Sequence, residues 1–190
     1  MAKIILASGS PRRRELLKMI APDYVVASGK DVDETYPAEL SPELVPAFLS
    51  QLKAMPYKAD LQPGDILITA DTVVILDGRI LGKPHSRDEA IEMLMSMQGR
   101  THTVVTGVTL TTPDDSETFS QHTEVIFDSL SLDEVTYYVD NYRPFDKAGA
   151  YGIQEWIGAA AITGIRGSFY NVMGLPIHAL YKALRSRGAV

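Results

Sequence analysis

Cysteine is absent from the 190 residues of this chain. Disulfide bonds, a thiol nucleophile and thiolate metal ligands are therefore excluded. Neither a Walker A sequence nor a G-x-G-x-x-G fingerprint is present, which excludes the P-loop and dinucleotide-binding classes. The spacing of a metal-binding motif is also missing from the four histidines, which are His85, His102, His122 and His178.

Long apolar runs and an excess of basic residues are missing as well. No apolar stretch approaches the length needed to cross a membrane, so we expect no membrane partner. The formal net charge is −6, whereas a broad nucleic-acid surface is basic, so we expect no nucleic-acid partner either. A strand predicted at residues 3–7 leaves no room for a signal peptide, and we expect a cytoplasmic location.

The composition is that of a globular protein, with 45% hydrophobic and 22% charged residues. A chain of 190 residues suits one domain with a substantial core, so we predict a single domain over residues 1–190. Apolar periodicity, capping residues and turn signals place its elements. Strands are predicted at 3–7, 24–27, 66–76, 79–81, 101–112, 117–127 and 159–165, and helices at 11–20, 41–55, 86–97, 131–141 and 168–187.

Turn signals decide the fold class. Asp77-Gly78 is typical of a hairpin, so residues 79–81 should pair back on the preceding strand. Residues 113–115 join two further strands, whereas residues 143–158 are predicted to be irregular. These hairpins exclude a purely parallel sheet although strands and helices alternate, so we predict an α/β fold with a mixed sheet. Capping boxes are predicted for the pairs Ser86 with Glu89 and Ser131 with Glu134.

The segment Leu6–Leu17 leads from a strand through small residues into a helix that begins with arginines. Ser10 is a good N-cap, and Pro11 suits the first helical position. The cations at Arg12–Arg14 are unfavourable there by about 0.3–1 kcal/mol each, because of the helix macrodipole. Guanidinium and backbone N–H groups gathered in one place suit a phosphate, and a solvated basic turn is the alternative.

The helical wheel separates these arginines. Arg12 and Arg13 lie on the face of Leu16 and Leu17, which packs inward, whereas Arg14 falls on the solvent side. We therefore expect Arg12 and Arg13 to be held at the edge of a pocket.

Asp71 stands in the middle of the nearly continuous apolar run Ile66–Leu76. Because a buried carboxylate needs a partner, such a residue usually has a cation, a metal or a catalytic role. The alternative is that the strand breaks at Ala70 and Asp71 caps a bend.

The loop that follows residue 28 supplies three carboxylates, Asp31, Asp33 and Glu34. Mg²⁺ binds oxygen ligands, often one or two carboxylates together with substrate phosphates. A solvated acidic loop explains the same run.

Three further side chains are weaker candidates. Lys83, between a strand and a capped helix, and Lys53, on the second helix, have the charge to bind a phosphate. The segment Asp146–Gln154 combines a charged pair, two glycines and an amide, and the Gln154 amide offers both a donor and an acceptor to a base. A glycine-rich turn with incidental polar residues is the alternative.

Taken together and in order, these pieces resemble the Maf proteins, the house-cleaning nucleoside triphosphate pyrophosphatases. The resemblance covers almost the whole chain. It rests on Ala7–Arg13, Asp31–Glu34, Lys53-Ala54, Ala70–Val74, Gly82–Pro84, Gly99–His102, Thr106–Val108, Asp146–Gln154 and Asn171–Pro176.

The resemblance implies an elongated mixed-sheet fold, similar to the ITPase-like enzymes, with two lobes around a nucleotide-binding cleft. It implies metal-dependent hydrolysis of a nucleoside triphosphate to the monophosphate and pyrophosphate, with Asp71 as the proton acceptor. We predict Mg²⁺ or Mn²⁺ as the cofactor, held by Glu34. The predicted phosphate-binding residues are Ser8, Ser10, Arg13, Lys53 and Lys83. A homodimer is an expectation from the family only.

Base selection is also implied by the resemblance. Family members that act on dTTP and UTP carry an arginine, a threonine and a glutamine, which match Arg12, Thr72 and Gln154. Relatives that prefer 7-methyl-GTP have an aromatic residue, a glutamine and a glutamate there. The predicted function is therefore hydrolysis of dTTP and UTP. The alternatives are the same reaction on another or modified nucleotide, and a nucleotide-binding regulator of cell division.

Two segments depart from the family pattern. Residues 140–145 lack the Thr-Gly-Glu sequence that many members have before their Asp-Lys-Ala-Gly run. Gln154 is followed by Glu155 and Trp156, where many members have glycine at once. No residue of this chain is therefore assigned the role of that glutamate, and Trp156 is a candidate rim or dimer residue.

Overall fold

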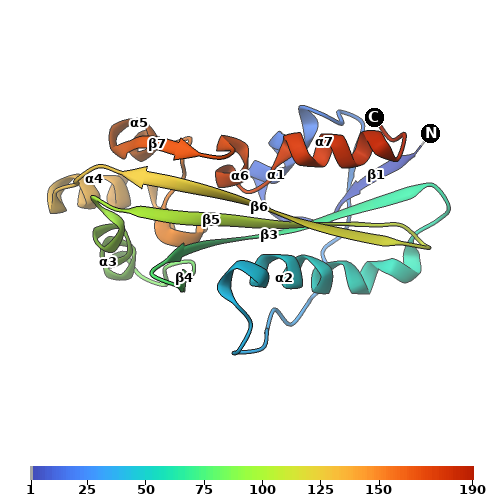
Figure 1. The fold of residues 1–190 in the computed structure, drawn as a ribbon, viewed down its shortest axis with the longest axis horizontal. Coiled ribbons are helices and arrows are strands. Elements are labelled where there is room, and N and C mark those ends of the chain that lie inside the picture. Colours follow the sequence, from blue (N-terminus) through green and yellow to red (C-terminus); the bar gives the residue numbers. More distant parts are fainter. Residues whose placement is uncertain (1) are drawn as a thin grey trace. The chain divides into compact units, whose positions relative to one another are not determined.

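The computed structural model describes residues 2–190, which form seven strands, seven α-helices and three 3-10 helices (Figure 1). The strands are β1 (Lys3–Leu6), β2 (Val25–Val26), β3 (Asp65–Leu76), β4 (Arg79–Leu81), β5 (Thr101–Thr111), β6 (Ser116–Phe127) and β7 (Ile162–Arg166). The α-helices are α1 (Pro11–Lys18), α2 (Val45–Ala54), α3 (Arg87–Met97), α4 (Leu132–Tyr142), α5 (Trp156–Ala161), α6 (Phe169–Met173) and α7 (Ile177–Ser186). The 3-10 helices are η1 (Pro42–Leu44), η2 (Met55–Asp60) and η3 (Ala148–Ala150).

The strands form one mixed sheet in the order β2-β1-β3-β5-β6-β7, with β4 paired to β3. β1 runs parallel to both of its neighbours, with Ile5 opposite Val25 of β2 and Leu67 of β3. β4 is antiparallel to β3, and β7 is antiparallel to β6. The prediction of an α/β fold with a mixed sheet is confirmed.

The chain divides into two compact units. The first unit comprises residues up to Asp71 together with Thr106–Gln121 and Gly174–Val190, and the second comprises Thr72–Val105 and His122–Met173. Strands β3, β5 and β6 contribute residues to both units.

The hairpin between β3 and β4 confirms a turn that the sequence predicts. Asp77 has φ 51° and Gly78 has φ 71°, so both central residues are in the left-handed region. That pair of dihedrals is what a two-residue hairpin turn requires, and an Asp-Gly sequence tolerates it best.

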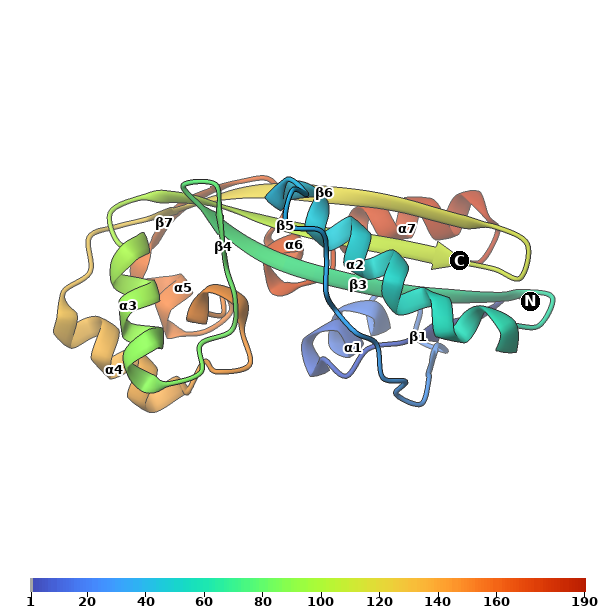
Figure 2. The same ribbon diagram turned by 90° about the horizontal axis from the view of Figure 1, so that it is seen from below.

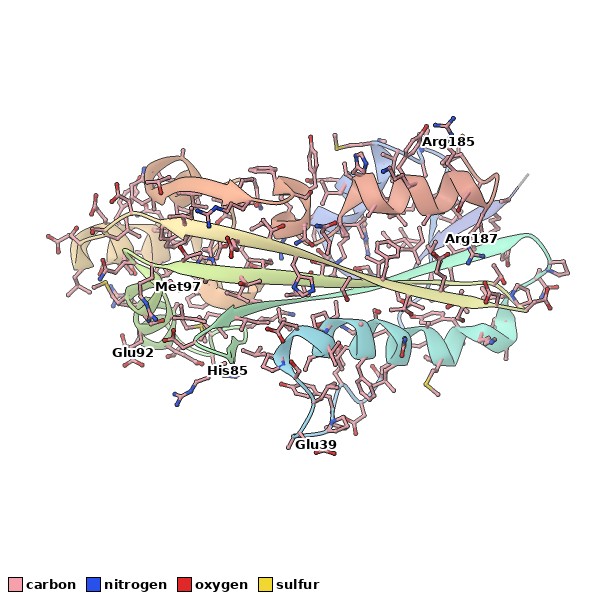
Figure 3. All side chains as sticks on the ribbon, viewed as in Figure 1. Glu39, His85, Glu92, Met97, Arg185 and Arg187 are labelled. Atoms are coloured by element: carbon pink, nitrogen blue, oxygen red, sulfur yellow. The ribbon has the colours of Figure 1, made fainter. Side chains whose placement is uncertain are left out.

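In the first unit, helices α2 and α7 lie on either side of the strands (Figure 1). Apolar residues on α7, among them Leu180 and Leu184, are fully buried, which explains why the helix is held there. Arg187, just after α7, binds the β5–β6 hairpin through Asp115 at 3.0 Å and Glu117 at 2.9 Å (Figure 3).

The second unit has its core under α3 and α4, which lie side by side (Figure 2). Leu94 and Met97 of α3 and Val135 and Tyr138 of α4 are fully buried in one cluster. Spacings of three residues place these apolar side chains on one face of each helix, as the sequence pattern indicates.

Two predicted elements are wrong in extent. The helix predicted over residues 168–187 is two helices, α6 and α7, because Gly174 has φ 115° and Pro176 cannot continue a helix. Residues 156–161, predicted partly as irregular and partly as strand, form α5. A six-residue helix is too short for its apolar period to be recognised.

One of the two predicted capping boxes is complete. At α4, Ser131 caps Glu134 and the Glu134 carboxylate binds back to the Ser131 amide. At α3, the Ser86 hydroxyl accepts from the Glu89 amide, but the Glu89 carboxylate binds the amide of His85 instead. The second box is therefore corrected to a simple N-cap.

No helix within residues 2–190 is both long enough and apolar enough to cross a membrane.

Gly107 of β5 provides the first test of the packing. A Cβ added there would lie 2.3 Å from the backbone nitrogen of Ala47 in α2. We expect Gly107→Ala to lower the free energy of unfolding by about 1–3 kcal/mol, because the backbone of α2 must shift. Urea denaturation measures this, with Gly164→Ala in β7 as the control, because its Cβ would meet only the Ile126 side chain at 3.5 Å. Equal losses of stability in both variants would contradict the conclusion that the backbone of α2 packs directly against Gly107.

His102 is a buried histidine in the core of the second unit. Its Nε2 atom lies 2.7 Å from the Tyr151 hydroxyl, and its ring meets Phe127 edge-on at 4.9 Å. Within residues 2–190 its Nδ1 atom has no hydrogen-bond partner. Burial lowers the pKa of His102 to about 4, so the ring is neutral at pH 7.

This histidine makes stability depend on pH. Because its ordinary pKa is about 6.5, the unfolded chain binds more protons than the folded chain between pH 4 and 6.5. Its contribution is therefore complete above pH 6.5 and decreases as the pH falls toward 4, by about 3 kcal/mol. Urea denaturation between pH 4 and 7 should show this loss in the wild type and a smaller one in His102→Gln. An NMR titration of His102 with a midpoint near 6.5 would contradict it.

Candidate active site

Arg13 is the best-anchored member of the arginine run. Its Nε atom donates to the Gly174 carbonyl at 2.8 Å, and an Nη atom donates to the Ala70 carbonyl at 2.9 Å. Both acceptors are neutral, so the hydrogen bonds orient the guanidinium without cancelling its charge. The expectation that Arg13 is held rather than solvated is confirmed.

The charges around Arg13 belong to one cluster in the first unit. Burial lowers the pKa of Arg13, and the nearby positive charge of Arg12 acts in the same direction. The carboxylates of Asp71 and Glu34 act in the opposite direction and raise it. An arginine keeps its charge under such influences, so Arg13 is a fixed cation beside two carboxylates.

The turn before α1 is held by its own serines. The Ser8 hydroxyl accepts from the Ser10 amide at 3.2 Å, and the Ser10 hydroxyl accepts from the Arg13 amide at 3.5 Å. Ser10 is therefore the N-cap that the sequence predicts, with Pro11 as the first helical residue. Arg14 is exposed and reaches back to the Ser8 carbonyl, as expected for the solvent side of the helix.

Asp71 finds its partner in Lys53. The Lys53 ammonium lies 2.6 Å from Asp71 Oδ1 and 3.0 Å from Glu34 Oε2. The side chains of Asp71 and Lys53 are only 13% and 20% exposed. β3 continues through Ala70 and Asp71 without a break, so the alternative that Asp71 caps a bend is wrong.

The carboxylate pair fits a divalent cation. Residues 2–190 contain no group of three histidine or carboxylate side chains that could hold a metal ion by themselves. Glu34 and Asp71 nevertheless turn their oxygens toward the same cation, the Lys53 ammonium. Two hard oxygen donors, completed by substrate phosphates and water, are a set that Mg²⁺ and Mn²⁺ accept. Asp31 and Asp33 stay exposed, and Asp33 caps the amide of Thr35.

The other predicted residues lie in the second unit. Thr72 is half-buried in β3, whereas Lys83 and Gln154 are exposed. The Gly149 amide donates to the Gly82 carbonyl at 3.0 Å, which joins the Lys83 loop to the segment that leads to Gln154. Thus the structure groups Ser8, Ser10, Arg12, Arg13, Glu34, Lys53 and Asp71 in the first unit, and Thr72, Lys83 and Gln154 in the second.

Sequence reasoning missed the groups that hold these residues. The carbonyls of Ala70 and Gly174 orient Arg13, and the sequence carries no sign of backbone acceptors. Tyr138 and Glu155 clamp the turn around Gln154, and only the unusual Glu155 after the glutamine pointed toward them. Such contacts join residues that are far apart in the chain, so no local pattern reveals them.

The fold resembles that of a HAM1 protein from Coxiella burnetii, with a TM-score of 0.51 and 14% identity over 98% of this chain and all of that chain. At this identity the likeness concerns the fold alone. The Maf-like protein family model matches residues 3–187, and the chain belongs to that family.

Relatives within the family are much closer in sequence. A Bacteroides thetaiotaomicron protein named dTTP/UTP pyrophosphatase is 54% identical over 183 residues, which cover 96% of this chain and 95% of the relative. A Porphyromonas gingivalis protein of the same name is 52% identical over 188 residues, covering 98% of this chain and 94% of the relative.

The position of Lys53 leads to a prediction about metal binding. Lys53→Gln removes the ammonium that Glu34 and Asp71 share, so the two carboxylates should bind a divalent cation more tightly without nucleotide, by about tenfold. Titration with Mn²⁺, followed by electron paramagnetic resonance, measures this affinity. Lys30→Gln is the control, because Lys30 pairs with the exposed Asp60. An unchanged Mn²⁺ affinity in Lys53→Gln would show that the carboxylates do not act as a metal-binding pair.

Proposed function

We propose that this chain is a metal-dependent pyrophosphatase that hydrolyses dTTP and UTP to the nucleoside monophosphate and pyrophosphate. The observation that carries the proposal is the cluster around Asp71, in which a mostly buried carboxylate lies beside Lys53 and a carbonyl-anchored Arg13. Relatives that are 54% and 52% identical bear the name of this activity, which supports the same substrates here.

In this mechanism Asp71 accepts the proton of the attacking water. Its carboxylate is held in place by Lys53, so it needs little reorganisation when the proton arrives. A metal ion held by Glu34, Asp71 and the phosphate oxygens would supply charge neutralisation and alignment for in-line attack. Catalysis then rests mainly on positioning and electrostatic stabilisation, as in other phosphoryl chemistry.

Cations bind the triphosphate. Arg13 is oriented by two carbonyls and would bind a phosphate oxygen through its guanidinium. Arg12 lies close enough to Arg13 to influence its pKa, so the two guanidinium groups form one positive region. Lys53 is a further cation of the first unit, and the Ser8–Ser10 turn offers backbone donors. Lys83, in the second unit, is a point charge that would also bind a phosphate oxygen.

Base selection falls to Arg12, Thr72 and Gln154. Thymine and uracil present carbonyl acceptors and a ring N–H donor, and the Gln154 amide matches one of each. A site that hydrogen-bonds its substrate rejects analogues that leave its polar groups unpaired. A cytoplasmic location and a homodimer stay predictions from the sequence.

The proposed chemistry is tested by the products and by Asp71. With Mg²⁺ or Mn²⁺, the protein should release pyrophosphate from dTTP and UTP, and less from dCTP and 7-methyl-GTP. Asp71→Asn should lower kcat by about 10²–10⁴ because it removes the proton acceptor but keeps the shape. The control is Asp60→Asn, which neutralises an exposed carboxylate that also pairs with a lysine.

Three results would contradict this proposal. Release of the nucleoside diphosphate and phosphate would place the cleavage at the γ-phosphate. Activity that persists in the presence of a chelator would show that hydrolysis does not need a divalent metal. Near wild-type turnover in Asp71→Asn would make Asp71 structural.

A further inference from the structure

Gln154 stands in a tight turn of the second unit. The Glu155 amide donates to the Gly152 carbonyl at 3.0 Å, which closes a four-residue turn with Gln154 near its tip. The Gln154 side chain is exposed, whereas Gly152 and Ile153 are buried. Because little packs against the amide itself, its position depends on how firmly the turn is held.

Tyr138 holds the turn from α4. The residue is fully buried, and its hydroxyl accepts a hydrogen bond from the Gly152 amide at 3.0 Å while it donates one to Glu155 Oε2. One hydroxyl therefore binds both sides of Gln154. Burial and the hydrogen bond to Glu155 raise the pKa of Tyr138, so the hydroxyl keeps the proton that it donates.

Lys147 holds the other oxygen of Glu155. Its ammonium lies 3.2 Å from Glu155 Oε1 and 2.8 Å from Asp146 Oδ1. The side chains of Lys147 and Glu155 are 10% and 19% exposed, so water screens this pair only weakly. Both carboxylate oxygens of Glu155 are thus used within the second unit.

The backbone fits tightly against this ion pair. A Cβ added at Gly152 would lie 3.0 Å from both Glu155 Cδ and Lys147 Cε. On the other side, a Cβ added at Gly158 of α5 would lie 1.7 Å from the Ile153 carbonyl oxygen. The turn is therefore enclosed from two directions and leaves little room to shift.

We propose that Tyr138, Lys147 and Glu155 are positioning residues that fix the Gln154 turn and so set base selectivity. This inference rests on the proposed function, because it takes Gln154 to contact the base. None of the three touches substrate in this role. They act by limiting the directions in which the Gln154 amide can point.

The chemistry of the bases makes this restriction matter. Cytosine reverses the pattern of uracil, with a ring acceptor beside an amino donor, and an amide that rotates by half a turn can match either one. A firmly held turn fixes the backbone position of Gln154 and so limits the distance and angle at which its amide meets the base, whereas a loose turn lets the amide shift to suit either pattern. Loss of the clamp should therefore reduce discrimination between dTTP and dCTP, mainly through KM, while the proton acceptor Asp71 is unchanged.

Tyr138→Phe tests the clamp with the smallest change, because it removes one hydroxyl and keeps the ring. We expect the ratio of kcat/KM for dTTP to that for dCTP to fall about tenfold, with most of the change in KM. Tyr137→Phe is the matched control, since it removes a hydroxyl from an exposed ring on the same helix. It should leave the ratio unchanged.

The route through Gln154 is tested by combining variants. Gln154→Ala alone should lower the dTTP preference, and adding Tyr138→Phe to it should lower the preference no further. If Tyr138→Phe does not fold, Glu155→Gln takes its place, because it puts an amide beside the Lys147 ammonium. Glu155→Asp should recover part of the selectivity that Glu155→Gln loses.

The outcomes separate the two proposals. If Gln154→Ala lowers the preference but the Tyr138 and Glu155 variants only reduce thermal stability, the clamp is structural and this inference fails while the proposed function stands. A further loss of preference in the double variant would also overturn it. If Gln154→Ala leaves the preference intact, Gln154 does not read the base and both proposals about selectivity fail.

Discussion

A carboxylate in the middle of a buried strand must meet a positive charge, and the first unit is organised around that requirement at Asp71. Lys53 meets it from α2, and the same ammonium reaches Glu34 on a loop that has no regular structure. Helix, strand and loop are thereby joined at one point. Arg13 adds a second cation, which two backbone carbonyls hold in place, so the cluster places positive charge next to its carboxylates. The metal and the triphosphate that we propose for this site would need charges of both signs close together, and this cluster has them.

The sequence predicts the fold well where local signals and burial agree. Apolar patterning predicts a strand over Ile66–Leu76, and the Asp77-Gly78 sequence predicts a tight turn after it. The structure has both, as β3 and its hairpin with β4. The prediction is wrong at α5, because six residues show no period, and at Gly174, because a single glycine can end a helix or be tolerated within one. An element is predicted correctly when many residues indicate it together, and wrongly when its presence or end depends on a few.

The candidate site divides in the same way. Charged side chains such as Arg13 and Asp71 can be recognised because they stand where charge is unfavourable, in a helix start and in a buried strand. Their roles stay predictions, but their positions in one cluster are observed. The groups that orient them could not be predicted, since backbone carbonyls have no sequence signature and the Tyr138 hydroxyl acts across 14 residues of chain. The sequence therefore identifies the charged side chains of the candidate site, and the structure identifies the groups that hold its residues in position.

The break between α6 and α7 limits which substitutions this segment can accept. The Gly174 carbonyl accepts from Arg13 where the backbone turns, at φ 115°, whereas in an unbroken helix the same carbonyl would point along the helix axis toward an amide one turn later. A regular helix through this segment would therefore turn away one of the two carbonyls that orient the Arg13 guanidinium. Substitutions that raise helix propensity around Gly174 favour a continuous helix, and they thereby weaken the hydrogen bond between Arg13 and the Gly174 carbonyl. The irregular backbone at Gly174 thus helps to order the Arg13 side chain, which is far away in the sequence.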